Sequence, residues 1–394
     1  MNILIINSGS SSIKYQLIKM PSKKVICVGS IERIGSTDAI SNYKTDANKV
    51  EKIYEIASHK AGLERITSLL LDAEIGVLKS TEDIDAIGHR VVHGGADYTE
   101  TTLIDEEVKS KIKKLSTLAP LHNPANLQGI VMAEEIFTTA KQVVVFDTAF
   151  HGTVPVKAKK YALPNELYEN DGIHAYGFHG TSHKYVSEKA NEYLHKENTK
   201  LISIHLGNGC SITAIKDGKS IDHSMGFAPS NGLIMGTRSG DIDHSFIYYM
   251  VNTLGYSLDD VNELLNKKSG MLGLTGFNDL RDIEEEASNG NANCILALEM
   301  NAYRIRKCIG AYTATMNGLD AIIFTAGIGE NSSLMRQLVC KDMGYFNFQL
   351  DDSKNDLRSK KIREINTTDS KVKILVIPTN EELEIAKQVY ELLN

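Results

Sequence analysis

Apolar runs that stop at short, glycine-containing polar turns mark the expected strands of the chain. In ILIINSGSSSIKYQL, Ile3–Leu17, the apolar run ends at a glycine beside a cluster of hydroxyl residues and resumes as an alternating pattern after Lys14. Alternation with a period of two is typical of strands, so this stretch predicts a hairpin. IDAIGHRVVHGG predicts a strand that runs into a glycine-marked loop, and QVVVFDTAF predicts a buried strand with Asp147 at its far end.

Helical spacing of apolar residues lies between these strands. It recurs in EKIYEIASHKAGLERITSLLL and in HNPANLQGIVMAEEIF, where Asn123 suits an N-cap and Pro124 the first helical turn. KVKILVIPTNEELEIAKQVYELL predicts a strand and then an amphipathic helix, with Thr379 and Glu382 at capping-box spacing. This alternation favours an α/β fold with ligands at the carboxyl ends of the strands.

A weak internal repeat points to duplication. The opening stretch is echoed by LISIHLGNGCSITAIKDGK, Leu201–Lys219, which again has an apolar strand, a small polar glycine turn and a second alternating strand. AIIFTAGIGENSS is a third glycine loop that follows a strand and precedes a helical pattern. The repeat predicts two similar domains, each contributing a turn to a shared cleft, with a boundary near residue 150. Chance similarity of two hairpins is the alternative explanation.

Composition narrows the class of protein. The chain has 394 residues, of which 24% are charged and 42% hydrophobic, a size typical of about two globular domains. Its net charge of -7 argues against nucleic-acid and anionic-membrane partners, because those interfaces need a basic surface. The five cysteines form no CxxC pair, and no apolar run approaches about 18 residues, so we expect a cytoplasmic protein.

The three glycine turns have the composition of phosphate-binding loops. Glycine permits the close approach and the backbone conformations that let N–H groups converge on a phosphate. NSGSSSIK is not a P-loop, because Lys14 is followed by Tyr15, and GNGCSI lacks the third glycine of a dinucleotide fingerprint. Singly, each turn is better explained by a structural role, whereas together they favour a nucleotide site.

The order of eight short stretches carries a family resemblance. From end to end the chain contains INSGSSSIKYQL, GHRVVHGG, FDTAFH, YGFHGTSH, HLGNGCS, GLIMGTRSGDID, FTAGIGENS and PTNEE. This combination closely resembles the acetate kinase family, within the sugar kinase, Hsp70 and actin superfamily. The resemblance implies two duplicated actin-like, ribonuclease H-like domains with mixed sheets and an inter-domain cleft. It also implies ATP/ADP with Mg²⁺ (or Mn²⁺), a homodimer, and reversible in-line phosphoryl transfer from ATP to acetate, giving acetyl phosphate.

The same resemblance divides the chain by task. Residues 1–150 with 382–394 would form the acyl-substrate and metal side, and residues 151–381 the nucleotide-binding and dimerisation domain. Arg90 and Arg238 stand at loop-like points beside glycines, where a guanidinium fork is suited to gripping planar anions. The family assigns the matching arginines to substrate and transferring phosphoryl group. We assign Arg90 mainly to the substrate and Arg238 mainly to the transition state.

Two further catalytic residues follow from the resemblance. His179 would donate a hydrogen bond to the phosphoryl group. Its spacing with His183 would also suit a metal pair on one helix face, but the flanking glycines argue against a helix there. Asp147 matches a family residue sometimes described as an acid or base. A carboxylic acid substrate with a pKa of about 4 to 5 is already ionised at neutral pH, so orienting an arginine or a metal-bound water is the expected role.

Binding residues are carried over from the resemblance residue by residue. The expected cofactor-binding residues are Lys14, Ser10, Ser12, His205, Leu206, Gly207, Asn208, Gly209, Asp279, Leu280, Arg281, Gly327, Ile328, Gly329, Glu330 and Asn331. Leu280 departs from the family, which usually has Phe there. The expected metal ligands are Asn7 and Glu381, since Mg²⁺ prefers oxygen ligands. The acyl pocket would include Val92, Leu121, Phe178 and Pro229, all of which would equally suit a hydrophobic core.

Two other functions compete with acetate kinase at this level. A propionate or butyrate kinase would use the same machinery, because one methylene in an apolar pocket is worth only about 1 to 3 kcal/mol. A non-catalytic, nucleotide-dependent chaperone or filament protein of the same superfamily would need the glycine turns. It would not need Arg90, His179 and Arg238.

Overall fold

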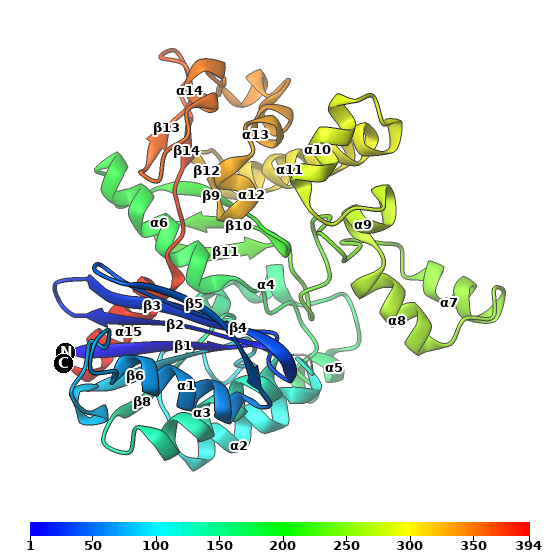
Figure 1. The fold of residues 1–394 in the computed structure, drawn as a ribbon. Coiled ribbons are helices and arrows are strands. Elements are labelled where there is room, and N and C mark those ends of the chain that lie inside the picture. Colours follow the sequence, from blue (N-terminus) through cyan, green and yellow to red (C-terminus); the bar gives the residue numbers. More distant parts are fainter. Residues whose placement is uncertain (121) are drawn as a thin grey trace. The chain divides into compact units, whose positions relative to one another are not determined.

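The chain folds into two compact units (Figure 1). The computed structural model describes residues 1–120 and 122–394. Unit 1 comprises Met1–Ala149 and Asn380–Asn394, and unit 2 comprises Phe150–Thr379. The chain thus leaves unit 1 after Ala149 and returns to it at Asn380, so that unit 1 is discontinuous. The tasks that the sequence assigns to the two parts stay predictions.

Unit 1 is built on an eight-stranded mixed sheet of order β5-β4-β3-β2-β1-β6-β8-β7. Its strands are β1 (Asn2–Ser8), β2 (Ser12–Lys19), β3 (Lys24–Glu32), β4 (Ser36–Thr45), β5 (Lys49–Ile56), β6 (Ala86–Val91), β7 (Thr102–Leu103) and β8 (Lys141–Phe146). Its helices are α1 (His59–Leu70), α2 (Glu106–Lys114), α3 (Asn123–Ile136) and α15 (Glu381–Leu393). The predicted opening hairpin is confirmed, because β1 and β2 pair antiparallel from Ser8 and Ile13 onwards.

Alternate residues of β1 point to two different cores. Leu4 and Ile6 belong to a core that includes residues of α1 and α3, whereas Ile3 and Ile5 pack in a second core with α15. This period-two division is what a strand covered on both faces requires. β1, β6 and β8 run parallel, so their carboxyl ends meet at one edge of the sheet.

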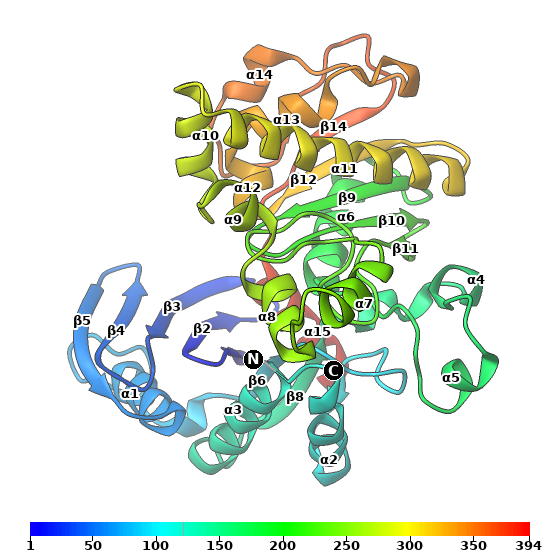
Figure 2. The ribbon, with the colours of Figure 1, turned by 90° about the vertical axis from the view of Figure 1, so that its right-hand side faces the viewer.

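Unit 2 is built on a six-stranded mixed sheet of order β11-β10-β9-β12-β14-β13. Its strands are β9 (Lys200–Leu206), β10 (Cys210–Lys216), β11 (Lys219–His223), β12 (Ala321–Thr325), β13 (Arg363–Glu364) and β14 (Lys373–Val376). Its helices are α4 (Val156–Lys159), α5 (Asn165–Glu169), α6 (Gly180–Leu194), α7 (Ser245–Asn252), α8 (Leu258–Lys267), α9 (Gly270–Thr275), α10 (Leu280–Ser288), α11 (Ala292–Met316), α12 (Ala326–Asn331), α13 (Ser333–Cys340) and α14 (Asp352–Asp356). Helices α6 and α11 both contact this sheet (Figure 2).

The two units repeat one strand arrangement. In unit 1 the order β3-β2-β1-β6-β8 has an antiparallel meander of three strands followed by two parallel additions. In unit 2 the order β11-β10-β9-β12-β14 has the same directions in the same sequence. The predicted α/β class with a mixed sheet in each half is therefore confirmed, and the repeat in the sequence is structural rather than a chance similarity of hairpins.

Several local predictions are wrong. The helix expected over EKIYEIASHKAGLERITSLLL is half strand, because β5 ends at Ile56 and α1 begins only at His59. Asn123 is the first residue of α3 rather than its cap. The third glycine stretch, which we expected to be a loop, begins the short helix α12. The cap of α15 is Asn380, whose side chain accepts a hydrogen bond from the Leu383 N–H, so Thr379 and Glu382 form no capping box.

No helix among the described residues is long and apolar enough to span a bilayer.

Candidate active site

Arg90, Asp147 and Glu381 form a charged cluster at the carboxyl edge of the unit 1 sheet. Arg90 lies near the end of β6 and Asp147 directly follows β8, so the parallel pairing of these strands brings them together. Arg90 Nε donates to Asp147 Oδ1 at 2.9 Å and Nη2 donates to Oδ2 at 2.5 Å. Glu381 Oε2, from the first residue of α15, lies 3.5 Å from Arg90 Nε. Arg90 therefore stands in a strand, and our expectation of a loop position is wrong.

Burial and the neighbouring carboxylates determine the ionisation of this cluster. Burial lowers the pKa of Arg90, but Asp147 and Glu381 outweigh that effect and the net shift is upward. Burial raises the pKa of Asp147, and the guanidinium opposes the rise. Since a guanidinium does not lose its proton in proteins, Arg90 is a partly buried cation that buried Asp147 holds in a two-point ion pair. Asp147 is placed to orient Arg90, whose charge it holds in one geometry.

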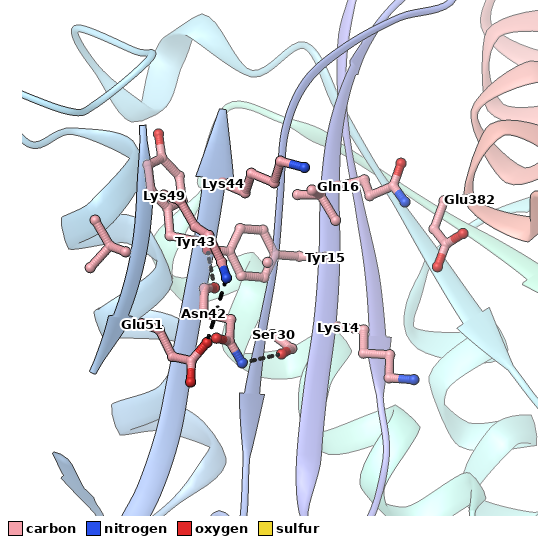
Figure 3. Close-up of a pocket in the computed structure, with 13 residues that line it drawn as sticks. Lys14, Tyr15, Gln16, Ser30, Asn42, Tyr43, Lys44, Lys49, Glu51 and Glu382 are labelled. Carbon is pink, nitrogen blue, oxygen red and sulfur yellow. Dashed lines mark hydrogen bonds and ion pairs between the residues drawn. The ribbon is translucent and has the colours of Figure 1, made fainter. Parts of the chain in front are cut away.

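The β1–β2 hairpin brings three predicted residues to one sheet face. Asn7 pairs with Lys14 across the hairpin, and Ser12 precedes Lys14 by two residues. Alternation places Ile13 and Tyr15 in the core, so Ser12 and Lys14 share the opposite face. Ser10 is exposed in the turn. Lys14 is exposed in unit 1 and lines the groove drawn in Figure 3.

That groove has a volume of about 440 Å³ and lies over strands β2 to β5. Its basic side chains are those of Lys14, Lys44 and Lys49, and its acidic ones those of Glu51 and Glu382. Figure 3 shows Glu382 reaching it from α15, on the same side as Gln16 and Lys14. Burial raises the pKa of Glu382, and the charges of Arg90 and Lys14 oppose the rise.

Two residues that the sequence did not single out support the first glycine turn. His59 Nε2, at the start of α1, lies 2.7 Å from the carbonyl oxygen of Gly9. The side-chain amide of Asn126, on α3, donates to the carbonyl of Ser8 at 2.6 Å. The sequence contains both residues in helical patterns, but nothing in those patterns says which turn each helix reaches.

In unit 2, His179 and Arg238 converge on the second glycine turn. His179 immediately precedes α6 with φ 58°, a left-handed conformation that is rare outside glycine. A Cβ atom on Gly209 would lie 3.2 Å from His179 Nε2 and 3.5 Å from Arg238 Nη2. Both nitrogen atoms thus face the backbone of the β9–β10 turn. The imidazole of His179 also stacks on that of His205, with 4.3 Å between ring centroids.

Arg238 is held by its own loop. Its Nη1 donates a short hydrogen bond to the carbonyl of Pro229. Burial lowers the pKa of Arg238. A guanidinium that is partly desolvated and fixed in direction is well suited to an anionic ligand, because its interaction with that ligand is weakly screened.

The chain has two pairs of histidines spaced by four residues, His179 with His183 and His89 with His93, and these pairs differ in structure. His179 and His183 lie one turn apart at the start of α6, so our argument against a helix there is wrong. His89 lies in β6, where its Nε2 is 2.8 Å from the side-chain oxygen of Gln142 and burial lowers its pKa to about 4. His93 Nδ1 accepts from the Gly95 N–H at 3.0 Å. Among the described residues, no group of three or more His, Cys, Asp or Glu could hold a metal ion.

A cavity of about 730 Å³ in unit 2 collects half of the expected nucleotide residues. Those lining it are Gly207, Asn208, Asp279, Leu280, Arg281, Gly327, Ile328 and Asn331. Asp279 caps α10 and pairs with Arg281, with 2.5 Å between Oδ2 and Nη2. The sequence missed Met235, Gly236 and Asn301, which also line the cavity. The side-chain oxygen of Asn301 is buried without a hydrogen-bond partner among the described residues.

The other expected cofactor residues of unit 2 do not line this cavity. Leu206 is buried in the core of the unit. Glu330 turns inward, where its Oε1 accepts from the Thr379 N–H at 3.1 Å and burial raises its pKa. His205 Nδ1 lies 2.8 Å from the Ser182 hydroxyl, and Gly329 accepts at its carbonyl from Arg336. These residues lie around the β9–β10 turn and α12. For them and for Gly209, a contact with nucleotide stays a prediction.

The residues expected to form an acyl pocket are divided among the units. Val92 belongs to unit 1, and its N–H donates to Asn126 Oδ1 at 3.1 Å. Phe178 is buried in unit 2, and Pro229 there accepts from Arg238. Leu121 lies outside the described residues. The acyl pocket therefore stays a prediction.

Comparison with known proteins gives one consistent result. Residues 2–387 match the Acetokinase family. The chain is 65% identical over 393 residues to the acetate kinase of Flavobacterium johnsoniae, with 100% of both chains covered. It is 43% identical to the crystallised acetate kinase of Porphyromonas gingivalis, with a TM-score of 0.94 and 100% of both chains covered. A propionate kinase from Francisella tularensis is also 43% identical, with a TM-score of 0.93 and 98% of both chains covered.

Proposed function

Because the chain belongs to the Acetokinase family, we propose that it is an acetate kinase, which transfers the γ-phosphoryl group of ATP to acetate and releases ADP and acetyl phosphate. The observation that carries this proposal is the match over residues 2–387, supported by an acetate kinase at 65% identity over the whole chain. The reverse reaction uses the same groups. Transfer is direct, with no phosphorylated enzyme.

The phosphoryl transfer depends on positively charged groups around the reactants rather than on a general base. A carboxylate oxygen of acetate attacks the γ-phosphorus, and the bond to the β–γ bridging oxygen breaks with ADP as the leaving group. Acetate is ionised at neutral pH, so Asp147 need not act as a base. Its two hydrogen bonds to Arg90, at 2.9 and 2.5 Å, support a role in holding the guanidinium that binds the acetate carboxylate.

His179 and Arg238 are proposed to bind the transferring phosphoryl group. Their Nε2 and Nη2 atoms face the same stretch of backbone at Gly209, so one anion placed there accepts from both. Donors fixed before the reaction stabilise the charge on the equatorial oxygens without reorganising. The proposal therefore requires Arg90 and this pair to act on the same phosphoryl group.

ATP is proposed to bind the unit 2 cavity through its nucleoside. The cavity holds a capped and paired Asp279–Arg281, the apolar side chains of Leu280 and Ile328, and the unpaired oxygen of Asn301. An unpaired buried acceptor is favourable only when a ligand or water donates to it. Backbone N–H groups of the β9–β10 turn then suit the phosphates.

Mg²⁺ is part of the proposal, with Mn²⁺ as a chemical substitute. Glu381 and Asn7 offer the carboxylate and amide oxygens that such ions prefer, and Mg²⁺ often takes only one or two protein ligands beside water and phosphate oxygens. Glu381 is only partly buried and lies 3.5 Å from Arg90, so it fits a bound water as well as direct contact. The ion would supply charge neutralisation at the phosphates.

A hydroxamate assay across short carboxylic acids tests the proposal. Acyl phosphate formed from ATP and acetate is trapped by hydroxylamine, and kcat/KM is compared for acetate, propionate and butyrate. The proposal expects the highest value for acetate. Preference for propionate would favour the second candidate, whose support is the propionate kinase that matches as well in structure. If no acid gave an acyl phosphate, both the acetate kinase and the propionate kinase proposals would be wrong. A non-catalytic chaperone or filament protein would then be the remaining candidate.

A homodimer and a cytoplasmic location complete the proposal. Helices α7 and α8 contact each other and leave Tyr248, Tyr249, Leu254 and Leu258 more than half exposed, at 65%, 56%, 52% and 68%. An apolar surface of this kind, which we call the α7–α8 face, is suited to a second copy of the chain. All five cysteines are free, which suits a reducing compartment.

A further inference from the structure

A continuous row of buried hydroxyl and imidazole groups ends at His179. Ser203 Oγ lies 2.8 Å from His183 Nδ1, and His183 Nε2 lies 2.7 Å from Ser211 Oγ. Ser211 Oγ in turn lies 2.9 Å from His179 Nδ1. The order Ser203, His183, Ser211, His179 is called the serine–histidine row below.

The fold explains why these four groups meet. Ser203 on β9 and Ser211 on β10 point to the same face of the unit 2 sheet, because Ser211 pairs with His205, two residues from Ser203. Helix α6 packs on β9 (Figure 2). His179 immediately precedes this helix, and His183 lies in its first turn. Ser203, His183 and Ser211 are 0%, 0% and 1% exposed, so the row is closed to bulk water except at His179.

Donor-to-acceptor hydrogen bonding can run continuously along this row in two directions. Burial lowers the pKa of His183 well below its usual range, so its ring is neutral and carries a single N–H. If His183 donates from Nε2, the Ser211 oxygen accepts that bond and its own proton is available to His179 Nδ1; with that bond made, His179 carries its proton on Nε2. If His183 donates from Nδ1, every bond reverses and His179 presents a bare nitrogen at Nε2.

We propose that Ser211 and His183 are positioning residues that hold the ring of His179 in the tautomer with its proton on Nε2. The ligand side selects this direction, because a phosphoryl group has acceptor oxygens only and His179 Nε2 faces the same backbone as Arg238 Nη2. In the reverse tautomer, a lone pair would point at the transferring oxygens. The inference rests on the proposed function for its ligand, but the tautomers of the protein without ligand can be measured whether or not that function holds.

Nitrogen-15 NMR of the protein labelled at histidine tests the tautomers directly. Protonated and bare ring nitrogens have well separated shifts, and His179 and His183 are assigned from His179→Gln and His183→Gln variants. The inference expects both rings to carry the proton on Nε2. A proton on Nδ1 of His183 would reverse the whole row and overturn it. This measurement needs no substitution at Ser211 and no substrate.

Kinetics of a double-mutant cycle test the function of the row. Ser211→Ala is expected to lower kcat about tenfold, the effect of about one buried hydrogen bond, with KM values for ATP and acetate within about twofold. Ser203→Ala, one link further away, lowers kcat less. Because the residues act in series, the double variant falls no further than Ser211→Ala alone, whereas independent effects would multiply.

Ser220→Ala provides the matched control. Ser220 is also fully buried in unit 2, and its Oγ lies 2.9 Å from His151 Nδ1, so its removal breaks a serine–histidine bond outside the row. We expect its kcat to stay near that of the unmodified protein and its effect to multiply with that of Ser211→Ala. A Ser211→Ala variant with unchanged kcat would overturn the inference. If the unmodified protein had no acetate kinase activity, the proposed function would be wrong, and the NMR measurement would still test the inference on the tautomers.

Discussion

At the scale of single residues, the charged cluster of the proposed site depends on a contact between distant positions of the chain. Arg90 and Asp147 are recognisable from their flanking residues, yet they are 57 positions apart, and their two-point ion pair depends on the parallel register of β6 and β8. The same holds for Ser211, which lies in a predicted strand with nothing to mark it as the partner of two histidines. Asn301 is equally unmarked within a long helix. Side chains that act through another group leave no local pattern.

Replacing Asp147 by Asn tests the orienting role. The amide keeps the shape of the carboxylate but removes the charge and one acceptor, so Arg90 loses its two-point partner. We expect kcat/KM for acetate to fall about 100-fold, since breaking a buried ion pair costs about 3 kcal/mol or more. Asp97→Asn, at an exposed partner of Lys111, serves as control and should leave kcat/KM unchanged. Wild-type activity in Asp147→Asn would refute the orienting role and any acid or base role together.

His89 gives a pH-dependent prediction. Burial lowers its pKa to about 4, against 6.5 for an ordinary histidine, so below pH 6.5 the unfolded chain binds a proton that the folded chain does not. The contribution of His89 to the free energy of unfolding therefore rises with pH between about 4 and 6.5. This contribution is lost as the pH falls toward 4. Each such histidine contributes a slope of about 1.4 kcal/mol per pH unit. Urea unfolding between pH 6.5 and 4.5 should show a shallower slope for His89→Gln; an unchanged slope contradicts the assignment.

At the scale of elements, periodicity predicts strands and helices well but fails where one pattern passes into another. The hairpin at Ile3–Leu17, the strand before Asp147 and the C-terminal helix are all confirmed. The boundary at Ile56, where β5 gives way to α1, is lost because Ile53 and Tyr54 fit both periods. Glycines mislead in a similar way: those at Gly207 and Gly209 mark a hairpin turn, whereas Gly327 and Gly329 lie inside α12.

Gly236 tests the link between a turn and the nucleotide. A Cβ atom there would lie 2.0 Å from the side-chain oxygen of Asn208, so Gly236→Ala must displace that side chain. We expect the dissociation constant for ADP to rise about tenfold, as for the loss of one hydrogen bond to a charged group, without a large loss of stability. Gly344→Ala, where a Cβ meets nothing within 4 Å, is the control. Unaltered ADP binding, measured by calorimetry, would exclude Asn208 from the nucleotide site.

At the scale of the whole molecule, the repeat is the strongest inference that the sequence allows. Two short stretches of similar pattern predict two similar units, and five strands of each sheet have the same order and directions. Neither the added strands β4 and β5 in unit 1 nor the helices α7 to α10 in unit 2 could be predicted from that repeat, because they are insertions into one copy only. The residues proposed for the reaction are likewise divided, because Arg90 belongs to unit 1 whereas His179 and Arg238 belong to unit 2.

The α7–α8 face predicts the oligomeric state. Leu258→Glu places a charge at its most exposed residue, and burying that charge in an interface of two copies is unfavourable. Light scattering after size-exclusion chromatography should therefore give a dimer for the unmodified protein and a monomer for the variant. Tyr345→Glu is the control, because Tyr345 is 90% exposed outside this face and its substitution should leave a dimer. If the Leu258→Glu protein were still a dimer, the α7–α8 face would not be the dimer interface.

Phosphorus NMR of the reaction tests the central claim most directly. The protein is mixed with ATP, Mg²⁺ and acetate, and the γ-phosphate signal is followed over time. Our account predicts that this signal is replaced by acetyl phosphate with equal formation of ADP, and that Arg90→Ala abolishes the transfer. It also predicts ATP formation when acetyl phosphate and ADP are supplied instead. Release of inorganic phosphate alone, or no change in the ATP signals, would contradict it.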